Sequence, residues 1–276
     1  MICDNDSRKK SYPAKPILRI LFLITLLGGG VLPGSAQAIY AENQIPSAGV
    51  QIEYRLTIEN PNSHIYLIEM DIRGIEEETL SVSMPAWAPG AYRIRDFARN
   101  VQDFEVRTRS GNRPLKWKKT DKLTWQVSKP TDDDIIVSYE VYSDRLTYEM
   151  ADISGPSTYM YVVGKKHVPV ALRYDKPGDW DVYTGLTRRR GAYRAADYDV
   201  FIDTPAFVGV FKVLEFTSGD IPYRLVFSDP DVEFIEEQVV GDIQSIVDAA
   251  VSMFGRAPYE DYTFLFKVQS GAGSGG

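Results

Sequence analysis

Apolar and polar residues alternate along much of the chain. Every second residue from Val50 to Ile58 is apolar and the residues between them are polar, which is the period of a strand with one buried face. Turn-forming stretches such as RSGNRP and KPTDDD separate the alternating runs. The same alternation predicts further strands at Tyr66–Ile72, Leu80–Met84, Phe104–Thr108, Leu123–Val127, Ile135–Tyr142, Tyr198–Ile202, Val210–Phe216 and Pro222–Phe227. Many short strands with turns between them indicate a mainly β protein, an antiparallel β-sandwich.

The period changes after residue 228. Apolar residues now recur every three or four positions, which predicts one face of a helix over Pro230–Phe254. Asp229 is the expected N-cap, Pro230 suits the first helical position, and Gly255 is the expected stop. The predicted buried face consists of Val232, Ile235, Val239, Ile243, Ile246, Ala250 and Phe254.

A last alternating run, Tyr262–Val268, predicts a strand that leads into the glycine-rich stretch SGAGSGG. The strand, helix and strand after about Pro205 are too few to form a core of their own. We therefore expect an N-terminal β domain over residues 39–204, followed by the opening of a second, α+β domain over 205–276. The tyrosine-rich stretch 148–193 shows no regular period and gives no strand prediction.

The first 38 residues have the pattern of an export signal. The basic residues Arg8, Lys9, Lys10 and Lys15 precede the apolar run Ile20–Leu27, and the stretch SAQA offers a cleavage site after Ala38. An uncleaved membrane anchor is the alternative, but three glycines and Pro33 interrupt the apolar run before it reaches the length of a spanning helix. We expect a periplasmic or extracellular protein with no stable membrane anchor after cleavage.

The net charge and the cysteine content argue against two classes of function, nucleic-acid binding and thiol catalysis. The whole chain has a net charge of −7, and loss of residues 1–38 leaves 26 basic and 36 acidic residues, a net charge of −10. Such an acidic chain is not expected to bind nucleic acid. Cys3 is the only cysteine, so the mature chain has no thiol for catalysis and no disulfide, which suits a bacterial-type export compartment.

Most residues that could act in catalysis or metal binding are better explained by structural roles. The two histidines, His64 and His167, lie about a hundred residues apart, and no H-E-x-x-H or G-x-S-x-G motif is present. We interpret both as surface or turn residues. The acidic runs Glu76–Glu78 and Asp132–Asp134 lack the ligand spacing of an EF-hand and are expected in hairpin turns. Arg188–Arg190 is expected to be an exposed basic turn rather than a protease-sensitive loop.

The stretch MPAWAPGAYRIRDF, Met84–Phe97, places prolines and a glycine around Trp87. Rigid residues around a large ring either hold the ring in the core as a plug or display it for recognition. We favour the plug. The glycine tail could itself be a phosphate loop or a linker, but it lacks the Lys-Ser/Thr pair that completes a P-loop.

Several segments stand out together: MPAWAPGAYRIRDFARNVQDFEV, LTWQV, YEVYS, ADYDVFIDTP and APYEDYTFLFKVQSGAGSGG. Across nearly the whole mature chain they resemble the glycyl aminopeptidase family, zinc metallopeptidases of the gluzincin group that usually carry a PDZ domain. The resemblance implies an N-terminal β domain and the incomplete start of a thermolysin-like catalytic domain. In that family a glycine loop continues into Glu-His, and a later helix carries H-E-x-x-H and binds zinc.

Only part of that site has a counterpart here. The resemblance assigns Gly275 and Gly276 to the substrate-binding glycine loop, and Tyr262–Val268 to an edge strand that pairs with an extended peptide substrate. No residue matches the zinc ligands or the general base, so no catalytic or metal residue is assigned and no cofactor is expected in this chain, although zinc is expected in the full-length family member.

Two functions follow from these observations. The first is the N-terminal portion of an exported zinc aminopeptidase, truncated before the zinc motif and inactive as it stands, which exposes apolar surface and self-associates through its incomplete catalytic domain. The alternative is a free-standing secreted β-sandwich module that binds peptides or glycans through its aromatic residues. A reading frame that continues beyond Gly276 into H-E-x-x-H would exclude the module.

Overall fold

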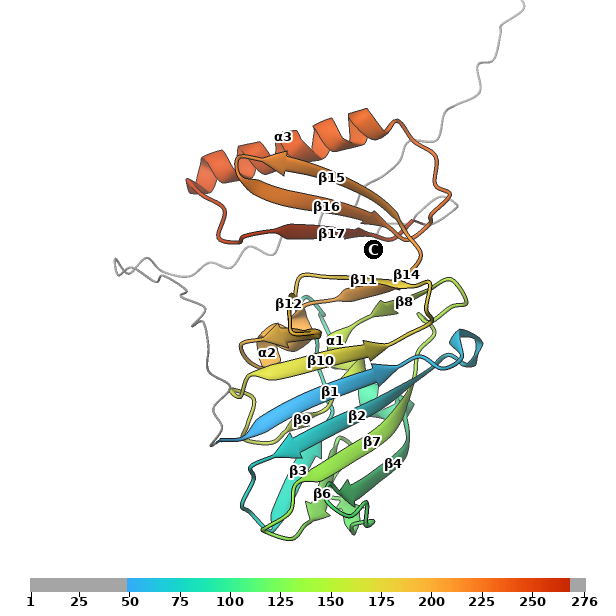
Figure 1. The fold of residues 1–276 in the computed structure, drawn as a ribbon, viewed down its shortest axis with the longest axis vertical. Coiled ribbons are helices and arrows are strands. Elements are labelled where there is room, and N and C mark those ends of the chain that lie inside the picture. The colour runs from blue at the N-terminus through green and yellow to red at the C-terminus, as the bar shows by residue number, and fades with distance from the viewer. Residues whose placement is uncertain (1–48, 269–276) are drawn as a thin grey trace, which may run out of the picture. The chain divides into compact units, whose positions relative to one another are not determined.

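The computed structural model describes residues 49–268. The predicted export signal, residues 1–38, lies outside them. The described chain forms four β-sheets, four short helical segments and one long helix, and the mainly β class is confirmed (Figure 1). Among the described residues no helix is long and apolar enough to cross a membrane.

The largest sheet has seven strands in the order β12-β13-β10-β1-β2-β7-β4. Its strands are β1 (Gln51–Thr57), β2 (Ile65–Arg73), β4 (Val101–Thr108), β7 (Ile135–Tyr142), β10 (Val170–Asp175), β12 (Thr187–Arg189) and β13 (Ala192–Ala195). All neighbours pair antiparallel except β1 and β10, which run parallel with Tyr54 opposite Leu172. The sheet therefore departs at this one pair from the purely antiparallel arrangement that the sequence predicts.

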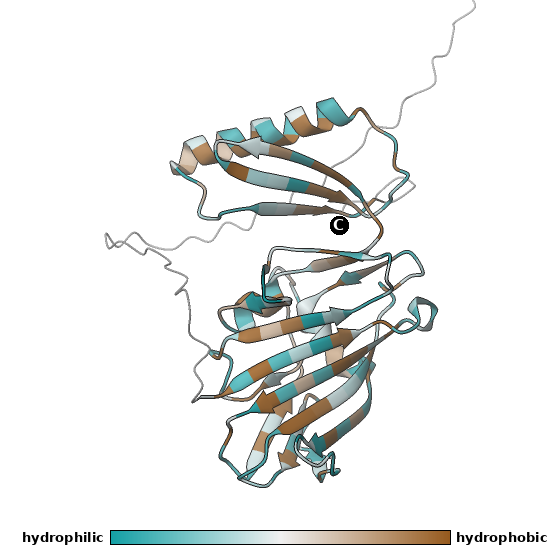
Figure 2. Cartoon of the chain, viewed as in Figure 1, coloured by the Kyte–Doolittle hydropathy of each residue, from teal (hydrophilic) through white to brown (hydrophobic). Residues whose placement is uncertain are grey.

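Two smaller sheets complete the β-sandwich, the name used here for residues 49–209. One has the order β5-β6-β3-β9 and the other β11-β14-β8. Their strands are β3 (Thr79–Ser83), β5 (Trp117–Lys119), β6 (Thr124–Ser128), β8 (Met150–Ile153), β9 (Tyr161–Val162), β11 (Asp181–Thr184) and β14 (Ala206–Gly209). Alternate residues of the long strands β1, β2 and β7 enter one continuous core, which Figure 2 shows as brown and teal bands along these ribbons.

Three buried tyrosines brace the chain between α1 (Gly155–Thr158) and β9. The hydroxyl of Tyr54 donates to the carbonyl of Met160 (2.7 Å), that of Tyr139 to Thr158 (3.1 Å), and that of Tyr198 to Tyr159 (2.6 Å). The three rings come from β1, β7 and α2 (Tyr198–Asp203). A segment with little ladder pairing thus has its carbonyls satisfied by side chains inside the core.

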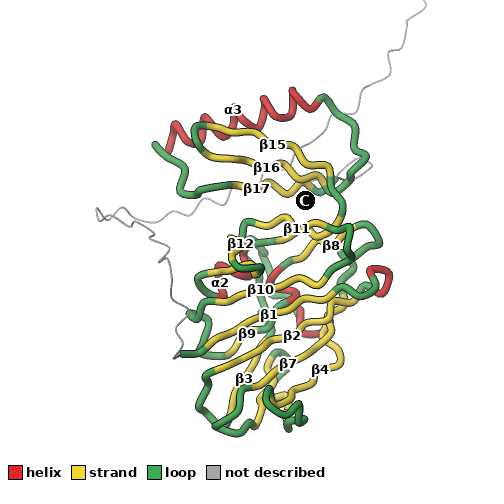
Figure 3. Tube along the Cα trace, in the orientation of Figure 1, coloured by secondary structure: helices red, strands yellow, loops and turns green. Residues whose placement is uncertain are grey.

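A separate group of elements follows, called the α3 unit. It consists of β15 (Lys212–Ser218), β16 (Ile221–Phe227), α3 (Glu236–Phe254) and β17 (Tyr262–Phe266). The sheet order is β15-β16-β17, with β16 and β17 parallel, and α3 packs on one face of the sheet (Figure 3). The short 3-10 turns η1 (Pro61–Ser63) and η2 (Phe97–Asn100) lie in the β-sandwich.

The predicted start of the long helix is wrong. Helix α3 begins at Glu236, and the carboxylate of Asp229 accepts from the backbone N–H of Asp231 (2.9 Å) in a local turn instead of capping a helix. Tertiary packing explains the delay, because the ring of Phe234 lies 4.7 Å from that of Phe227. The predicted stop is confirmed, since Gly255 takes the left-handed conformation, with a φ of 83°.

The predicted buried face of this helix is mostly wrong. Of its seven residues only Val239 and Ile243 are buried, together with the unpredicted Val247, and Val232 is partly buried. The other predicted residues, Ile235, Ile246, Ala250 and Phe254, are exposed. The helix carries apolar residues on two stripes, and the sequence alone does not say which stripe meets the sheet. Packing against β15 and β16 selects the stripe with Val247.

The strand predicted at Tyr198–Ile202 is also wrong. These residues form helix α2, in which Asp197 is the N-cap and its carboxylate accepts from the N–H of Val200 (2.8 Å). Tyr198 and Ile202 are buried. Either a strand or a helix would bury these two residues, so their apolar character does not distinguish the two structures. The stretch 148–193 contains strands that no pattern predicted. The domain boundary near Pro205 stays a prediction.

Candidate functional site

Strand β17 lies at one end of the three-stranded sheet of the α3 unit. Within the described residues it pairs with β16 alone, in parallel, with Leu225 opposite Phe264. Its other edge therefore presents backbone N–H and C=O groups that no described strand pairs with. An edge of this kind accepts an added strand in β-augmentation.

Aromatic rings gather around this strand. The rings of Tyr259 and Tyr262 lie 4.9 Å apart, and those of Tyr262 and Phe264 4.7 Å apart. The hydroxyls of Tyr223 and Tyr259 lie within hydrogen-bond distance, 3.2 Å. Burial is the main cause that raises the pKa of both Tyr259 and Tyr262 above the ordinary tyrosine value. Both rings are therefore neutral at physiological pH and offer apolar faces with polar tips.

The chain is held firmly where it leaves β17. The N–H of Ser228 donates to the carbonyl of Phe266 (2.9 Å), and the N–H of Val268 donates to the Ser228 hydroxyl (2.8 Å). One residue earlier, the ammonium of Lys267 lies 3.2 Å from a carboxylate oxygen of Asp152 in β8. These contacts fix the path of the chain after β17 as far as Val268. Gly275 and Gly276, the predicted substrate-binding residues, lie outside the described residues.

Sequence reasoning missed two of these supporting residues. Asp152 is more than a hundred positions from Lys267, and no local pattern links them. Ser228 lies just before Asp229, the predicted helix cap, and no local pattern links it to the end of β17. The only available signal was the position of Lys267 near the end of the predicted strand Tyr262–Val268.

The predicted aromatic plug is wrong. Trp87 is 50% exposed, Ile94 is 75% exposed and Tyr92 is fully exposed. Only the start of the segment, at Met84 and Pro85, is buried. The prolines hold a loop on the surface instead of driving the tryptophan ring into the core.

Both histidines have structural positions. His64 lies at the C-terminal end of η1 with a φ of 58°, and its Nδ1 lies 2.6 Å from the carbonyl oxygen of Leu146, which confirms a turn-stabilising role. His167 is exposed in the turn that precedes β10.

The two acidic runs lie in turns, whereas the predicted basic turn lies mostly in a strand. Glu76–Glu78 connects β2 to β3, and Asp132–Asp134 connects β6 to β7, as predicted. In the second run, Asp133 accepts from the hydroxyl of Ser110. Arg188–Arg190 is exposed, with its first two residues in the edge strand β12 and the third in the turn to β13.

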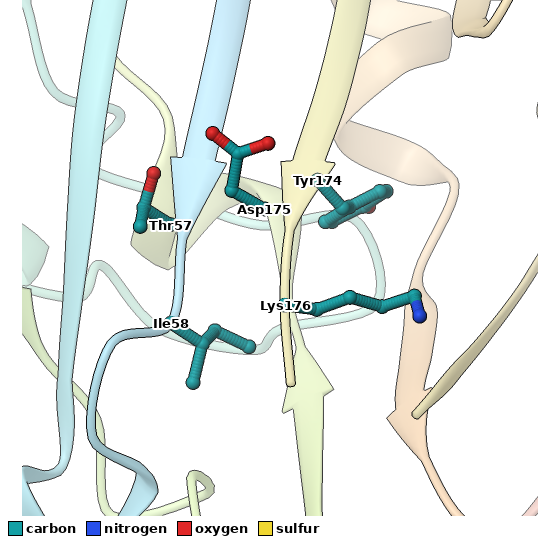
Figure 4. Close-up of a pocket in the computed structure, with 5 residues that line it drawn as sticks. All are labelled: Thr57, Ile58, Tyr174, Asp175 and Lys176. Carbon is teal, nitrogen blue, oxygen red and sulfur yellow. The ribbon is translucent and has the colours of Figure 1, made fainter. Parts of the chain in front are cut away.

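A shallow cavity of about 470 Å³ lies at the carboxyl ends of the parallel strands β1 and β10 (Figure 4). Thr57, Ile58, Tyr174, Asp175 and Lys176 line it. Its charged groups are already engaged, because Asp175 pairs with Arg55 at 2.7 Å and the Lys176 ammonium donates to the carbonyl of Trp180. A ligand would have to replace these contacts, so the cavity is a poor binding site.

The described residues do not fit a zinc centre. Across residues 49–268 no three His, Cys, Asp or Glu side chains are grouped so that they could hold a metal ion. His64 is additionally occupied by its contact with Leu146. No chemical step through zinc is therefore derived for this part of the chain.

The sandwich followed by a sheet with one covering helix defines the class of protein, the N-terminal part of an aminopeptidase-like fold. An aminopeptidase N family protein from Idiomarina loihiensis matches with a TM-score of 0.75 and 26% identity over 81% of this chain. The match covers 40% of the Idiomarina chain, so the present sequence spans well under half of that relative's length.

The Peptidase M61 N-terminal domain family matches residues 53–210, more than half of the sequence. The chain belongs to this family. The resemblance seen in the sequence is thus confirmed for the N-terminal domain. The match also spans the exposed Trp87 segment and the tyrosine brace.

Two further comparisons add no argument. The native leukotriene A4 hydrolase from Saccharomyces cerevisiae matches over 79% of this chain and 37% of its own, with 8% identity and a TM-score of 0.39, a likeness too weak to use. No curated protein sequence gives a significant match.

Proposed function

We propose that the chain is the N-terminal portion of an exported zinc metallo-aminopeptidase that removes N-terminal residues from peptides. The observation that carries this proposal is the α3 unit, which follows an M61 N-terminal domain and ends in an edge strand that leads into glycines. In this role the free edge of β17 aligns an extended peptide, and the glycine loop receives its amino terminus. Zinc and the general base come from chain that these 276 residues do not include.

The first test concerns activity. Purified residues 1–276 are expected to contain no stoichiometric zinc and to leave amino-acid amides intact, because the sequence has only two histidines and no H-E-x-x-H motif. The measurements are metal analysis and release of free amino acid. Stoichiometric zinc together with hydrolysis of the amides would contradict the claim that this portion is inactive.

The second test concerns the whole enzyme. If the reading frame continues beyond Gly276, its product is expected to contain H-E-x-x-H, bind zinc and hydrolyse amino-acid amides until a chelator removes the metal. Substituting Asp152→Asn in that product tests the role of the Lys267 contact in placing the glycine loop. A raised KM with a folded, zinc-loaded protein supports it, and unchanged kinetics contradict it.

The third test concerns export. The mature protein is expected to begin at Ile39 and to be recovered from the periplasm or the medium. Amino-terminal sequencing decides the point, since a secreted or cell-associated protein that still begins at Met1 contradicts cleavage.

Self-association is part of the same proposal. The exposed side chains of Ile246, Met253 and Phe254 form an apolar stripe on α3, and such a surface favours association in water. Light scattering is expected to show oligomers of residues 39–276, and the Met253→Glu variant is expected to reduce them. A monomer at all accessible concentrations contradicts this part of the proposal.

The alternative, a free-standing secreted binding module, retains one observation in its favour. The exposed aromatic segment around Trp87 belongs to the β-sandwich and needs no catalytic domain. A genuine stop after Gly276 with stable secretion of the short protein would favour the module over the peptidase portion.

A further inference from the structure

The Trp87 loop, defined as residues 85–95, leaves the sandwich after β3 and returns before η2. Its base is closed by a hydrogen bond from the N–H of Arg95 to the carbonyl of Ala86 (2.6 Å). Its tip is closed by a second bond, from the N–H of Ala91 to the carbonyl of Ala88 (3.0 Å). Gly90 has a φ of 78° between these two residues, so the tip is a tight turn that requires glycine at this position.

The tryptophan ring is fixed in its exposed position. Its indole N–H donates to the carbonyl of Ala91 (2.8 Å), four residues further along the loop. The bond ties Trp87 to the turn and leaves the ring face open to solvent. Tyr92 and Ile94 are exposed on the same short loop. Three large apolar side chains are therefore displayed on a backbone that is already ordered.

The loop is also a cationic spot on an acidic chain. Arg93 and Arg95 are both exposed, and neither guanidinium has an ion-pair partner among residues 49–268. The carboxylate nearest in sequence, that of Asp96, pairs with the ammonium of Lys122 at 4.0 Å instead. Against a net charge of −7 for the whole chain, two unpaired arginines beside aromatic rings make the loop complementary to a ligand with carboxylates and apolar groups.

We propose that the Trp87 loop binds an extended polypeptide segment that carries carboxylate side chains next to large apolar ones. Aromatic residues and arginine are the types most often found at the energetic centre of protein interfaces. Because the turn is preformed, little conformational entropy is lost on binding. The proposal concerns the β-sandwich and does not depend on peptidase activity.

A lipid surface is the less suitable partner. Tryptophans at a membrane interface keep the indole N–H for the polar headgroup region, whereas the N–H of Trp87 is already used inside the loop. The remainder of the chain is acidic and is repelled by anionic lipid. Single-stranded nucleic acid is disfavoured by the same net charge.

The test measures binding of short fluorescent peptides to purified residues 39–276. An alternating Glu and Phe/Leu peptide is expected to bind, while a peptide with Lys in place of Glu and one with Ser in place of the apolar residues bind at least about tenfold more weakly. The double variant Arg93→Gln/Arg95→Gln is expected to weaken binding about fivefold or more and to remove most of its salt dependence.

Matched variants separate the loop from the rest of the surface. Tyr92→Ala removes a fully exposed ring and is expected to weaken binding about fivefold without changing the unfolding midpoint. Tyr148→Ala and Arg189→Gln remove an exposed ring and an exposed guanidinium outside the loop and are expected to leave affinity unchanged. These variants keep the test valid even if a change at Trp87 disturbs the loop.

Three outcomes overturn the proposal. The first is that no acidic apolar peptide binds. The second is that Glu and Lys peptides bind equally, or that the loop variants bind as the wild type does. The third is that vesicles of phosphatidylcholine and phosphatidylglycerol, or a single-stranded oligonucleotide, bind in a loop-dependent way while the peptides do not.

Discussion

In the β-sandwich, strands of separate sheets bury alternate residues in one space, and 38 buried hydrophobic residues form a single core. In the α3 unit, one helix covers one face of a three-stranded sheet, and the corresponding cluster has six buried residues. A further three, Met150, Phe207 and Val226, join the other face of that sheet to the sandwich. The α3 unit therefore depends on a much smaller core and on contacts with its neighbour.

The two regions also differ in which polar groups they bury and where they leave apolar side chains exposed. The sandwich brings the hydroxyls of Tyr54, Tyr139 and Tyr198 into its core, where they donate to the carbonyls of residues 158–160. The sandwich exposes large apolar side chains in the Trp87 loop and at separate positions elsewhere, whereas the α3 unit leaves a stripe of apolar side chains exposed along its helix. The first arrangement completes a core, and the second leaves a surface that further polypeptide or another copy can cover. All four tryptophans lie in the sandwich. Within residues 49–268 the only long helix lies in the α3 unit, so fluorescence reports on the sandwich and helical circular dichroism mainly on the α3 unit.

Alkaline pH is expected to have the largest effect, and it acts mainly on the sandwich. Burial raises the pKa of Tyr54, Tyr139, Tyr159 and Tyr198 above the ordinary value. These groups stay protonated in the folded state and ionise in the unfolded chain, so stability is complete below about pH 10 and falls above it, by about 1.4 kcal/mol per pH unit for each group. The urea midpoint followed by tryptophan fluorescence is expected to fall steeply there.

The same titration has a clear contrary result. If the absorbance of tyrosinate rises at a lower pH than the one at which the urea midpoint falls, the buried hydroxyls ionise within the folded sandwich, which contradicts the prediction.

The small core of the α3 unit is tested by two isoleucines one helical turn apart. Ile243 is 1% exposed and Ile246 is 41% exposed. Ile243→Ala is expected to lower the stability seen by circular dichroism by about 2–4 kcal/mol, because it leaves a cavity under the helix. The matched variant Ile246→Ala is expected to change it by less than about 0.5 kcal/mol. Equal losses from both variants would show that the second stripe is also buried in solution.

A glycine in the sandwich tests the close packing of α1 on α2. A Cβ at Gly155 would overlap the backbone of Ile202, whereas one at Gly178 meets nothing within 4 Å. Gly155→Ala is expected to destabilise the sandwich by about 1–3 kcal/mol through overpacking, as seen in the fluorescence midpoint. Gly178→Ala serves as the control and is expected to leave it unchanged. Two neutral substitutions would contradict the close approach of the helices.

The smallest expected effect concerns the link between the regions. Lys267 in the α3 unit and Arg145 in the sandwich both lie near the carboxylate of Asp152, at 3.2 Å and 3.4 Å. Because Lys267 and Arg145 are about half exposed, Asp152→Asn is expected to cost less than about 1 kcal/mol and to separate the fluorescence and circular dichroism midpoints slightly. Coincident midpoints in the variant would mean that apolar contacts alone couple the two regions.

The fold could be predicted wherever one side of a strand is buried and the other is solvated. Strands β1, β2 and β7 follow the alternation almost residue for residue, because their two faces meet different environments. The pattern fails at residues 198–202, which alternate like a strand yet form α2. Tyr198, Phe201 and Ile202 are buried there while Val200 is exposed, so the tertiary contacts select a helical spacing over the alternation.

The candidate site shows the same division. The strand Tyr262–Val268 and the glycines after it are visible in the sequence, and so is the stop of the helix before them at Gly255. The contact of Lys267 with Asp152 joins residues that are far apart along the chain, and no local pattern predicts it. The sequence around Trp87 fits either a ring buried as a core plug or a ring displayed on the surface, because composition does not say on which side of a loop a ring will lie. The structure shows the displayed ring.

The sequence by itself determined the mainly β class, most strand positions, the end of the long helix and, through its quoted segments, the family. These features depend on local propensity and on a one-sided hydrophobic period. Only the tertiary structure decided the parallel pairing of β1 with β10, the late start of α3, the stripe that α3 buries and the display of Trp87. Each depends on which distant surface an element meets, because burial is a property of the packed molecule and not of the local segment.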